Sequence, residues 1–83
     1  MQHKNLLDIL GRQGLVRDGD AWVIPTSVQA TVYLSLDEES LIIDRVSRIE
    51  LHGETVSVIT QRKERYGVEL EGIRVLRFVS DAK

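Results

Sequence analysis

The chain has 83 residues, which is enough for one small domain spanning residues 1–83. It contains no cysteine, and this excludes a disulfide framework, thiol catalysis, iron–sulfur clusters and thiolate zinc sites. Hydrophobic residues make up 42% and charged residues 29%, which is too apolar for a disordered protein, and the formal net charge of −2 disfavours generic nucleic-acid binding.

The charge is unevenly distributed along the chain. Residues 1–44 carry three basic and seven acidic side chains, whereas residues 45–83 carry eight basic and six acidic ones. One interpretation is ordinary solvated surface. The other is a pair of complementary patches that meet between subunits.

A short helix is expected over residues 3–13. Leu6 and Leu10 are four positions apart and Leu7 lies beside them, so they form one apolar stripe. A helix of about three turns is not stable alone, and it must therefore dock on another element.

A hairpin is expected over residues 15–24, because Asp18-Gly19 is a preferred dipeptide for a two-residue turn. Pro25 cannot donate to a strand ladder and ends the second strand. The turn predicts three facing pairs: Arg17 with Asp20, Val16 with Ala21, and Leu15 with Trp22.

The clearest strand is predicted over residues 28–36, where apolar and polar side chains alternate without exception. One of its faces is expected to be buried and the other polar. A further strand is expected over residues 41–51. Asp44-Arg45 breaks its alternation, which indicates a bulge or a corner.

Residues 46–70 predict a three-strand meander. A two-residue turn at Gly53-Glu54 places apolar residues opposite apolar ones: Leu51 with Val56, and Ile49 with Val58, while His52 faces Thr55 and Glu50 faces Ser57. A three-residue loop at Arg62-Lys63-Glu64 between strands 55–61 and 65–70 then predicts a second set: Val58 with Val68, Val56 with Leu70, and Ser57 with Glu69.

The fold expected from these elements is α+β and mainly β. A short N-terminal helix packs on a bent antiparallel sheet or small open barrel of five to six strands. Gly72 allows a turn of 3₁₀ helix before a last strand at 73–79. The helix 3–13, the meander 46–70 and the turn at Gly72-Ile73 resemble the SH3-like and Sm-like small barrels, which implies the same architecture. The uridine-binding loop of Sm-like proteins has no counterpart here.

Two further segments have partial resemblances. The segment 65–70 is similar to a strand of the PilZ cyclic-di-nucleotide domain, but the paired-arginine segment and the Asp-x-Ser-x-x-Gly motif of that family are absent. Leu6 through Val16 and the hairpin to Trp22 resemble the last helix and wing of a winged helix, without the preceding helices. Neither resemblance assigns a functional role to any residue of this chain.

The sequence contains no recognisable catalytic, metal or phosphate-binding motif. His3 and His52 lack the spacing of zinc ligands, and the glycines do not form a phosphate-binding loop. We therefore expect a protein that is not an enzyme and uses no cofactor or metal. A small hydrolase or isomerase built across a dimer interface is the alternative if polar groups cluster in a cleft.

The one cluster of residues that stands out as a candidate binding site is the basic segment around residues 61–66. Its charges can form an anion or RNA surface, or can prevent sheet-to-sheet aggregation at a hairpin tip. Four further arginines are expected on one side of the sheet, because each alternates with core residues: Arg45, Arg48, Arg74 and Arg77. The candidate binding residues are Arg62, Lys63, Arg65, Tyr66, Arg74 and Arg77.

The expected function is that of a non-enzymatic binding or regulatory module that self-associates as a homodimer or other homo-oligomer. Edge pairing across a two-fold axis is the expected contact, with strand 28–36 contributing. Candidate interface residues are Tyr33 and Thr31 on the polar face of that strand, and Trp22. A protein partner is a further possibility, and the alternative is a nucleic-acid or nucleotide-binding domain that uses the basic segment.

A cytoplasmic location without membrane contact is also expected. The longest uninterrupted apolar run is Leu41-Ile42-Ile43, whereas a membrane span needs about 20 apolar residues. The amino-terminal residues lack the continuous apolar stretch of a secretory signal.

Overall fold

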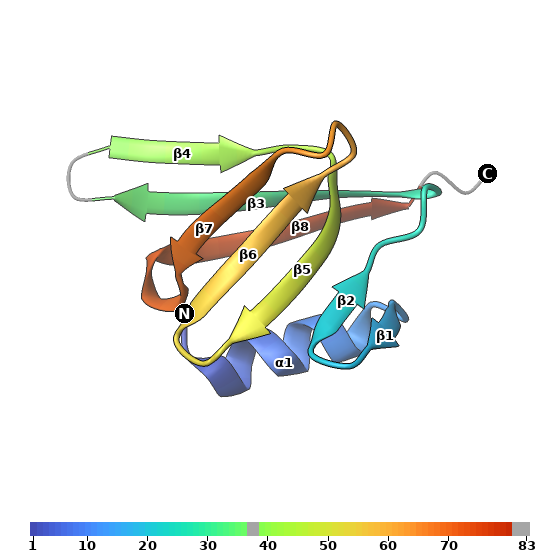
Figure 1. Cartoon of the computed structure of the whole chain (residues 1–83), viewed down its shortest axis with the longest axis horizontal. Helices are drawn as coiled ribbons and strands as arrows, with labels where there is room; N and C mark the ends of the chain where they lie inside the picture. The colour runs from blue at the N-terminus through green and yellow to red at the C-terminus, as the bar shows by residue number, and fades with distance from the viewer. Residues whose placement is uncertain (37–38, 81–83) are drawn as a thin grey trace.

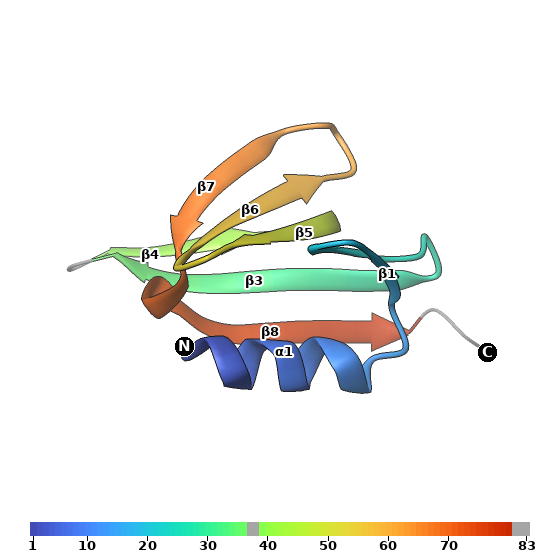
Figure 2. The ribbon, with the colours of Figure 1, turned by 60° about the horizontal axis from the view of Figure 1, so that its bottom comes forward.

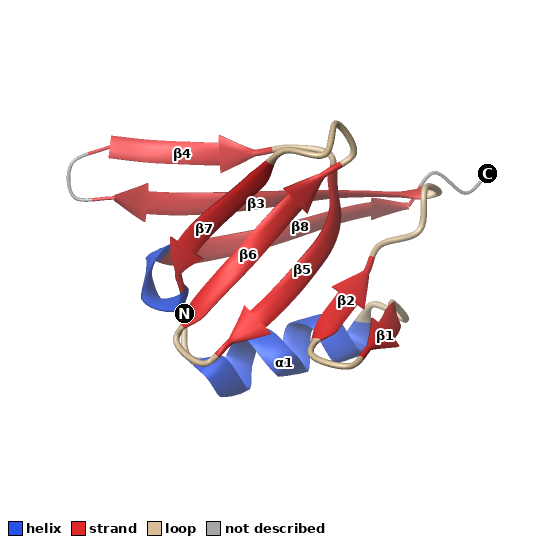
Figure 3. Cartoon of the chain, in the orientation of Figure 1, coloured by secondary structure: helices blue, strands red, loops and turns tan. Residues whose placement is uncertain are grey.

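The computed structural model describes residues 1–36 and 39–80 of the chain. Over these residues the chain is mainly antiparallel β-structure with one N-terminal α-helix, and the barrel is open, as predicted (Figures 1 and 3). The elements are α1 (His3–Arg12), β1 (Val16–Asp18), β2 (Ala21–Val23), β3 (Val28–Leu36), β4 (Glu39–Ile43), β5 (Val46–His52), β6 (Thr55–Thr60), β7 (Arg65–Glu69), the 3₁₀ helix η1 (Leu70–Gly72) and β8 (Ile73–Ser80).

The strands of the described residues form two sheets. The larger has the order β1-β2-β5-β6-β7 and the smaller β4-β3-β8. Figure 1 shows β5, β6 and β7 crossing obliquely in front of β3 and β8, and Figure 2 shows α1 running beside β8. Their inward side chains make one core, whose largest fully buried members are Leu6, Leu10, Val32, Leu34, Val46, Ile49, Val56, Val58 and Ile73.

The predicted helix is confirmed to within one residue. Leu6 and Leu10 are completely buried, so the apolar stripe docks on the sheets as its spacing required. Strand β3 spans Val28–Leu36, as predicted, and its inward residues Ala30, Val32 and Leu34 are buried.

The predicted break at Asp44-Arg45 is a corner at which the chain leaves one sheet for the other. Strand β4 ends at Ile43 in the smaller sheet, and β5 begins at Val46 in the larger one. Arg45 adopts a positive φ of 53° at this point. The expected strand 41–51 is therefore two strands, and together with the two short strands of the first hairpin this raises the number of described strands to eight.

The first half of the predicted meander is confirmed, and the second half is wrong by two residues. All four pairs across the Gly53-Glu54 turn are present. Across the next loop, however, Val58 faces Tyr66, Val56 faces Val68, and Ser57 faces Gly67, in place of Val68, Leu70 and Glu69.

The loop itself causes this shift. Lys63 adopts a left-handed φ of 70°, and the Thr60 N–H donates to the Glu64 carbonyl at 2.9 Å, so the loop closes one residue earlier than predicted. The Thr60 hydroxyl accepts the Glu64 N–H at 3.2 Å and fixes this closure. Leu70 leaves the ladder, begins η1 and is buried.

The register of the first hairpin is wrong by two residues, because its turn lies one residue later than predicted. Its turn is Gly19-Asp20, so Arg17 faces Trp22, Asp18 faces Ala21 and Val16 faces Val23. Gly19 takes the positive φ of 64° at the first turn position, and the Asp20 carbonyl accepts the Leu51 N–H at 2.9 Å, which extends the ladder to β5. Arg17 then lies over the Trp22 ring, 5.2 Å from its centre.

The chain end follows the prediction closely. The 3₁₀ turn forms at Leu70–Gly72, and β8 runs one residue beyond the predicted strand, to Ser80. Between the predicted strands 28–36 and 41–51, Asp37 and Glu38 lie outside the described residues, while Glu39 and Ser40 belong to β4.

Leu10→Ala is expected to lower the free energy of unfolding by about 2–5 kcal/mol, because Leu10 is fully buried and its removal leaves a cavity. Val16→Ala is the control, since Val16 is 62% exposed and should change stability by less than about 0.5 kcal/mol. Urea denaturation of both variants measures the difference. Equal stabilities would contradict the docking of α1.

Candidate functional site

The outer face of the smaller sheet carries an apolar row. Tyr33 pairs with Ile42 on one side and Val75 on the other, so these side chains lie in line across β4, β3 and β8. Among the described residues, four large apolar side chains are strongly exposed, and three of them share this face: Ile42 at 59%, Val75 at 51% and Val79 at 40%. Such a concentration of apolar surface is typical of a contact site.

A polar row lies beside the apolar one. The Thr31 hydroxyl donates to Asp44 Oδ1 at 2.8 Å, and Thr31 pairs with Arg77 on its other side. The Thr31 hydrogen bond, followed by the Arg45 N–H bond, lowers the pKa of the Asp44 carboxyl, with a contribution from the charge of Arg77. The row is therefore negative on the β4 side and positive on the β8 side. We call the surface formed by both rows and by Gln29 and Val79 the outer face.

The three predicted interface residues do not lie together. Tyr33 and Thr31 are on the outer face, where Tyr33 also lines a shallow hollow of 600 Å³ beside β8. Trp22 lies in β2 of the other sheet and is only 8% exposed. Its indole Nε1 is buried and has no hydrogen-bond partner among the described residues.

The predicted basic surface is divided among several places. Arg62 and Lys63 lie in the exposed β6–β7 loop, and Arg77 lies on the outer face. Arg65, Tyr66 and Arg74 line one groove instead. The arrangement does not bring the six candidate residues into a single patch.

Part of the basic charge is balanced by Glu50, a contact that the sequence reasoning missed. Its carboxylate lies 2.8 Å from Arg48 Nε, 3.0 Å from Arg65 Nη1 and 3.5 Å from His52 Nε2. The hydrogen bonds from Arg48 and then Arg65 lower the pKa of Glu50 from 4.5 to about 2. Arg48 and Glu50 lie two positions apart on β5, and this spacing is the sequence signal for their contact. The pairing of Glu50 with Arg65 has no such signal, because it depends on how β5, β6 and β7 lie side by side.

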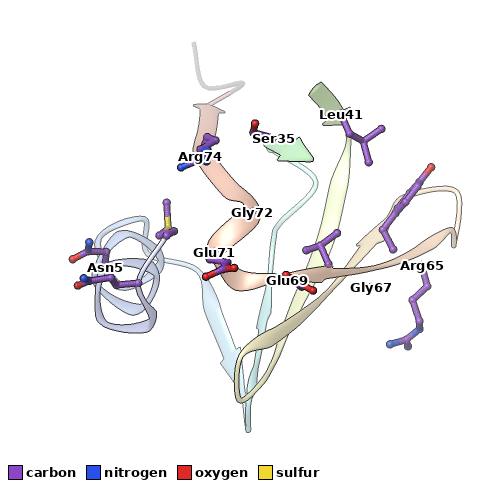
Figure 4. Close-up of a pocket in the computed structure, with 13 residues that line it drawn as sticks. Asn5, Ser35, Leu41, Arg65, Gly67, Glu69, Glu71, Gly72 and Arg74 are labelled. Carbon is purple, nitrogen blue, oxygen red and sulfur yellow. The ribbon is translucent and has the colours of Figure 1, made fainter. Parts of the chain in front are cut away.

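The groove lies along β7 and has a volume of 1140 Å³. All five residues of β7 line it, and Figure 4 shows Leu41 and Arg74 across from Gly67. Met1 also lines the groove, and its amino group donates to the carbonyls of Leu70 and Ile73 at 3.1 Å each.

Comparisons of this chain with protein-family models, with curated proteins and with solved structures find no match. Within residues 1–36 and 39–80, no three or more histidines and carboxylates are grouped as metal ligands. None of the helices in the same residues is long and apolar enough to cross a membrane.

Glu50→Gln is expected to lower the free energy of unfolding at pH 7. Because folding lowers the pKa of Glu50, this contribution is complete above pH 4.5 and is lost as the pH falls toward about 2. The wild type and the variant should therefore differ most at neutral pH and converge in acid. Urea denaturation at a series of pH values measures this, and a difference that does not change with pH would contradict the assigned contacts.

Proposed function

We propose that this chain is a non-enzymatic binding module that self-associates through the outer face. The single observation that carries the proposal is the apolar row of Ile42, Tyr33 and Val75. The proposal keeps the cytoplasmic location expected from the sequence. Strand β3 contributes with its face and not with an edge, because β4 and β8 occupy both of its edges.

The charges of the outer face favour a second copy of the chain as the binding partner. Turning a copy by 180° about an axis parallel to β3 brings β4 of one copy over β8 of the other. Asp44 then meets Arg77 of the second copy, and the same contact repeats on the other side of the axis. Ile42 meets Val75, while Tyr33 meets Tyr33. The face is therefore complementary to itself in both charge and apolar surface.

The nucleic-acid alternative has less support from the geometry. An electrostatic binding surface needs several uncompensated cations close together. Here Arg65 is paired with Glu50, and Arg77 lies one strand away from the Thr31–Asp44 hydrogen bond.

Val75→Asp is expected to weaken self-association by at least about tenfold, because it places a charge in the apolar row at the contact. Sedimentation velocity over a range of concentrations measures the association. Val16→Asp is the matched control, since Val16 is also exposed but lies in β1, away from the outer face. Unchanged association of Val75→Asp, or equal weakening by both variants, would contradict the proposal.

A further inference from the structure

Strand β7 is the last strand of the larger sheet, and no described strand pairs with its second edge. The 1140 Å³ groove lies along this strand, and Ser35 of β3 and Leu41 of β4 also line it. An open edge presents backbone donors and acceptors to any extended chain of matching pattern.

Two hydrogen bonds fix which backbone groups of β7 face outward. The Glu64 carbonyl accepts from Thr60 N–H, and Leu70 N–H donates to the Glu54 carbonyl, both at 2.9 Å. In an antiparallel ladder, successive residues bond alternately to one side and the other. Tyr66 and Val68 therefore bond to β6. Arg65, Gly67 and Glu69 direct their N–H and C=O groups to the open edge.

We propose that β7 pairs edge to edge with β7 of a second copy, antiparallel and with the two-fold axis at Gly67. In this register Arg65 faces Glu69 of the second copy, Gly67 faces Gly67, and Glu69 faces Arg65. These are the residues whose backbone groups point outward, so each of the three pairs exchanges both of its hydrogen bonds.

The side chains agree with this register. Charged residues on an edge normally oppose pairing. Here Arg65 and Glu69 stand at equal distances from Gly67, so they attract in the antiparallel register and would meet like charges in a parallel one. On the other side of the strand, Tyr66 faces Val68 of the second copy, and both are half-buried residues that line the groove.

Gly67 also suits the centre of such a contact. Glycine has no side chain, which allows a second backbone to approach closely. A Cβ built at this position stands out from the face of the sheet and has no atom within 4 Å, so alanine is also accommodated there. Because β7 and the outer face are different surfaces, the edge contact stands independently of the proposed function. If both contacts form, the chain assembles beyond a dimer.

Amide hydrogen exchange of the wild-type chain tests the edge contact directly. The amides of Arg65, Gly67 and Glu69 should exchange fast in dilute solution and become protected as the concentration rises. Those of Tyr66 and Val68 should be protected throughout. Fast exchange of Arg65, Gly67 and Glu69 at every concentration, with or without assembly, would overturn the proposal.

Gly67→Pro and Gly67→Ala form a matched pair for the same contact. Proline removes an N–H that does not bond to β6, so the sheet keeps its ladder while association through the edge weakens by at least about tenfold. Alanine keeps the N–H and should associate like the wild type. Should proline unfold the chain, as circular dichroism would show, Glu69→Arg replaces it, because the introduced guanidinium meets the like charge of Arg65 in the second copy.

Combining Gly67→Pro with Val75→Asp separates the two proposals. Each single variant should stop at a dimer and the double variant should be a monomer. If only Gly67→Pro weakens association, the edge contact is retained and the outer-face contact is rejected. If only Val75→Asp weakens association, the outer-face contact is retained and the edge contact is rejected.

Discussion

The corner at Asp44-Arg45 is the constraint on which the rest of the structure depends. The Asp44 carboxylate accepts the Thr31 hydroxyl at 2.8 Å and the Arg45 N–H at 3.0 Å, so it ties the corner to the middle of β3. The chain changes sheets there, and β5 then starts the meander that crosses the inner face of β3 (Figure 1). The inner face of the smaller sheet is buried as a result, while its outer face carries no described element.

The same division creates two surfaces of different character. On the smaller sheet, the side chains of the apolar row are exposed on the outer face. The polar row beside it carries opposite charges at its two ends. On the larger sheet the meander ends with β7, whose backbone groups at Gly67 point to the open edge. Both surfaces are complementary to a copy of themselves across a two-fold axis, and the proposed self-association rests on this complementarity. In the proposed outer-face contact the uneven charge along the chain contributes directly, because Asp44 belongs to the acidic half and Arg77 to the basic half.

The Asp18-Gly19 turn forms one residue later than its dipeptide predicted, but strict alternation and the other glycine turn predicted their elements well. The strand 28–36 and the pairs across Gly53-Glu54 are examples, since Gly53 takes the positive φ of 67° that its turn needs. The register after β6 is not predictable from a glycine, because Lys63 adopts the left-handed conformation in that loop. For the candidate site, the alternation of apolar and polar residues in the strand 28–36 predicted the outward position of Tyr33. The dispersal of the arginines did not, because it depends on the corner, the shifted register of β7 and the contacts of Glu50.

Sedimentation velocity of the wild-type chain up to high micromolar concentration tests the central claim most directly. Self-association through these surfaces predicts species heavier than the 9.4 kDa monomer, in proportions that rise with concentration. A single 9.4 kDa species over the whole range would contradict the account.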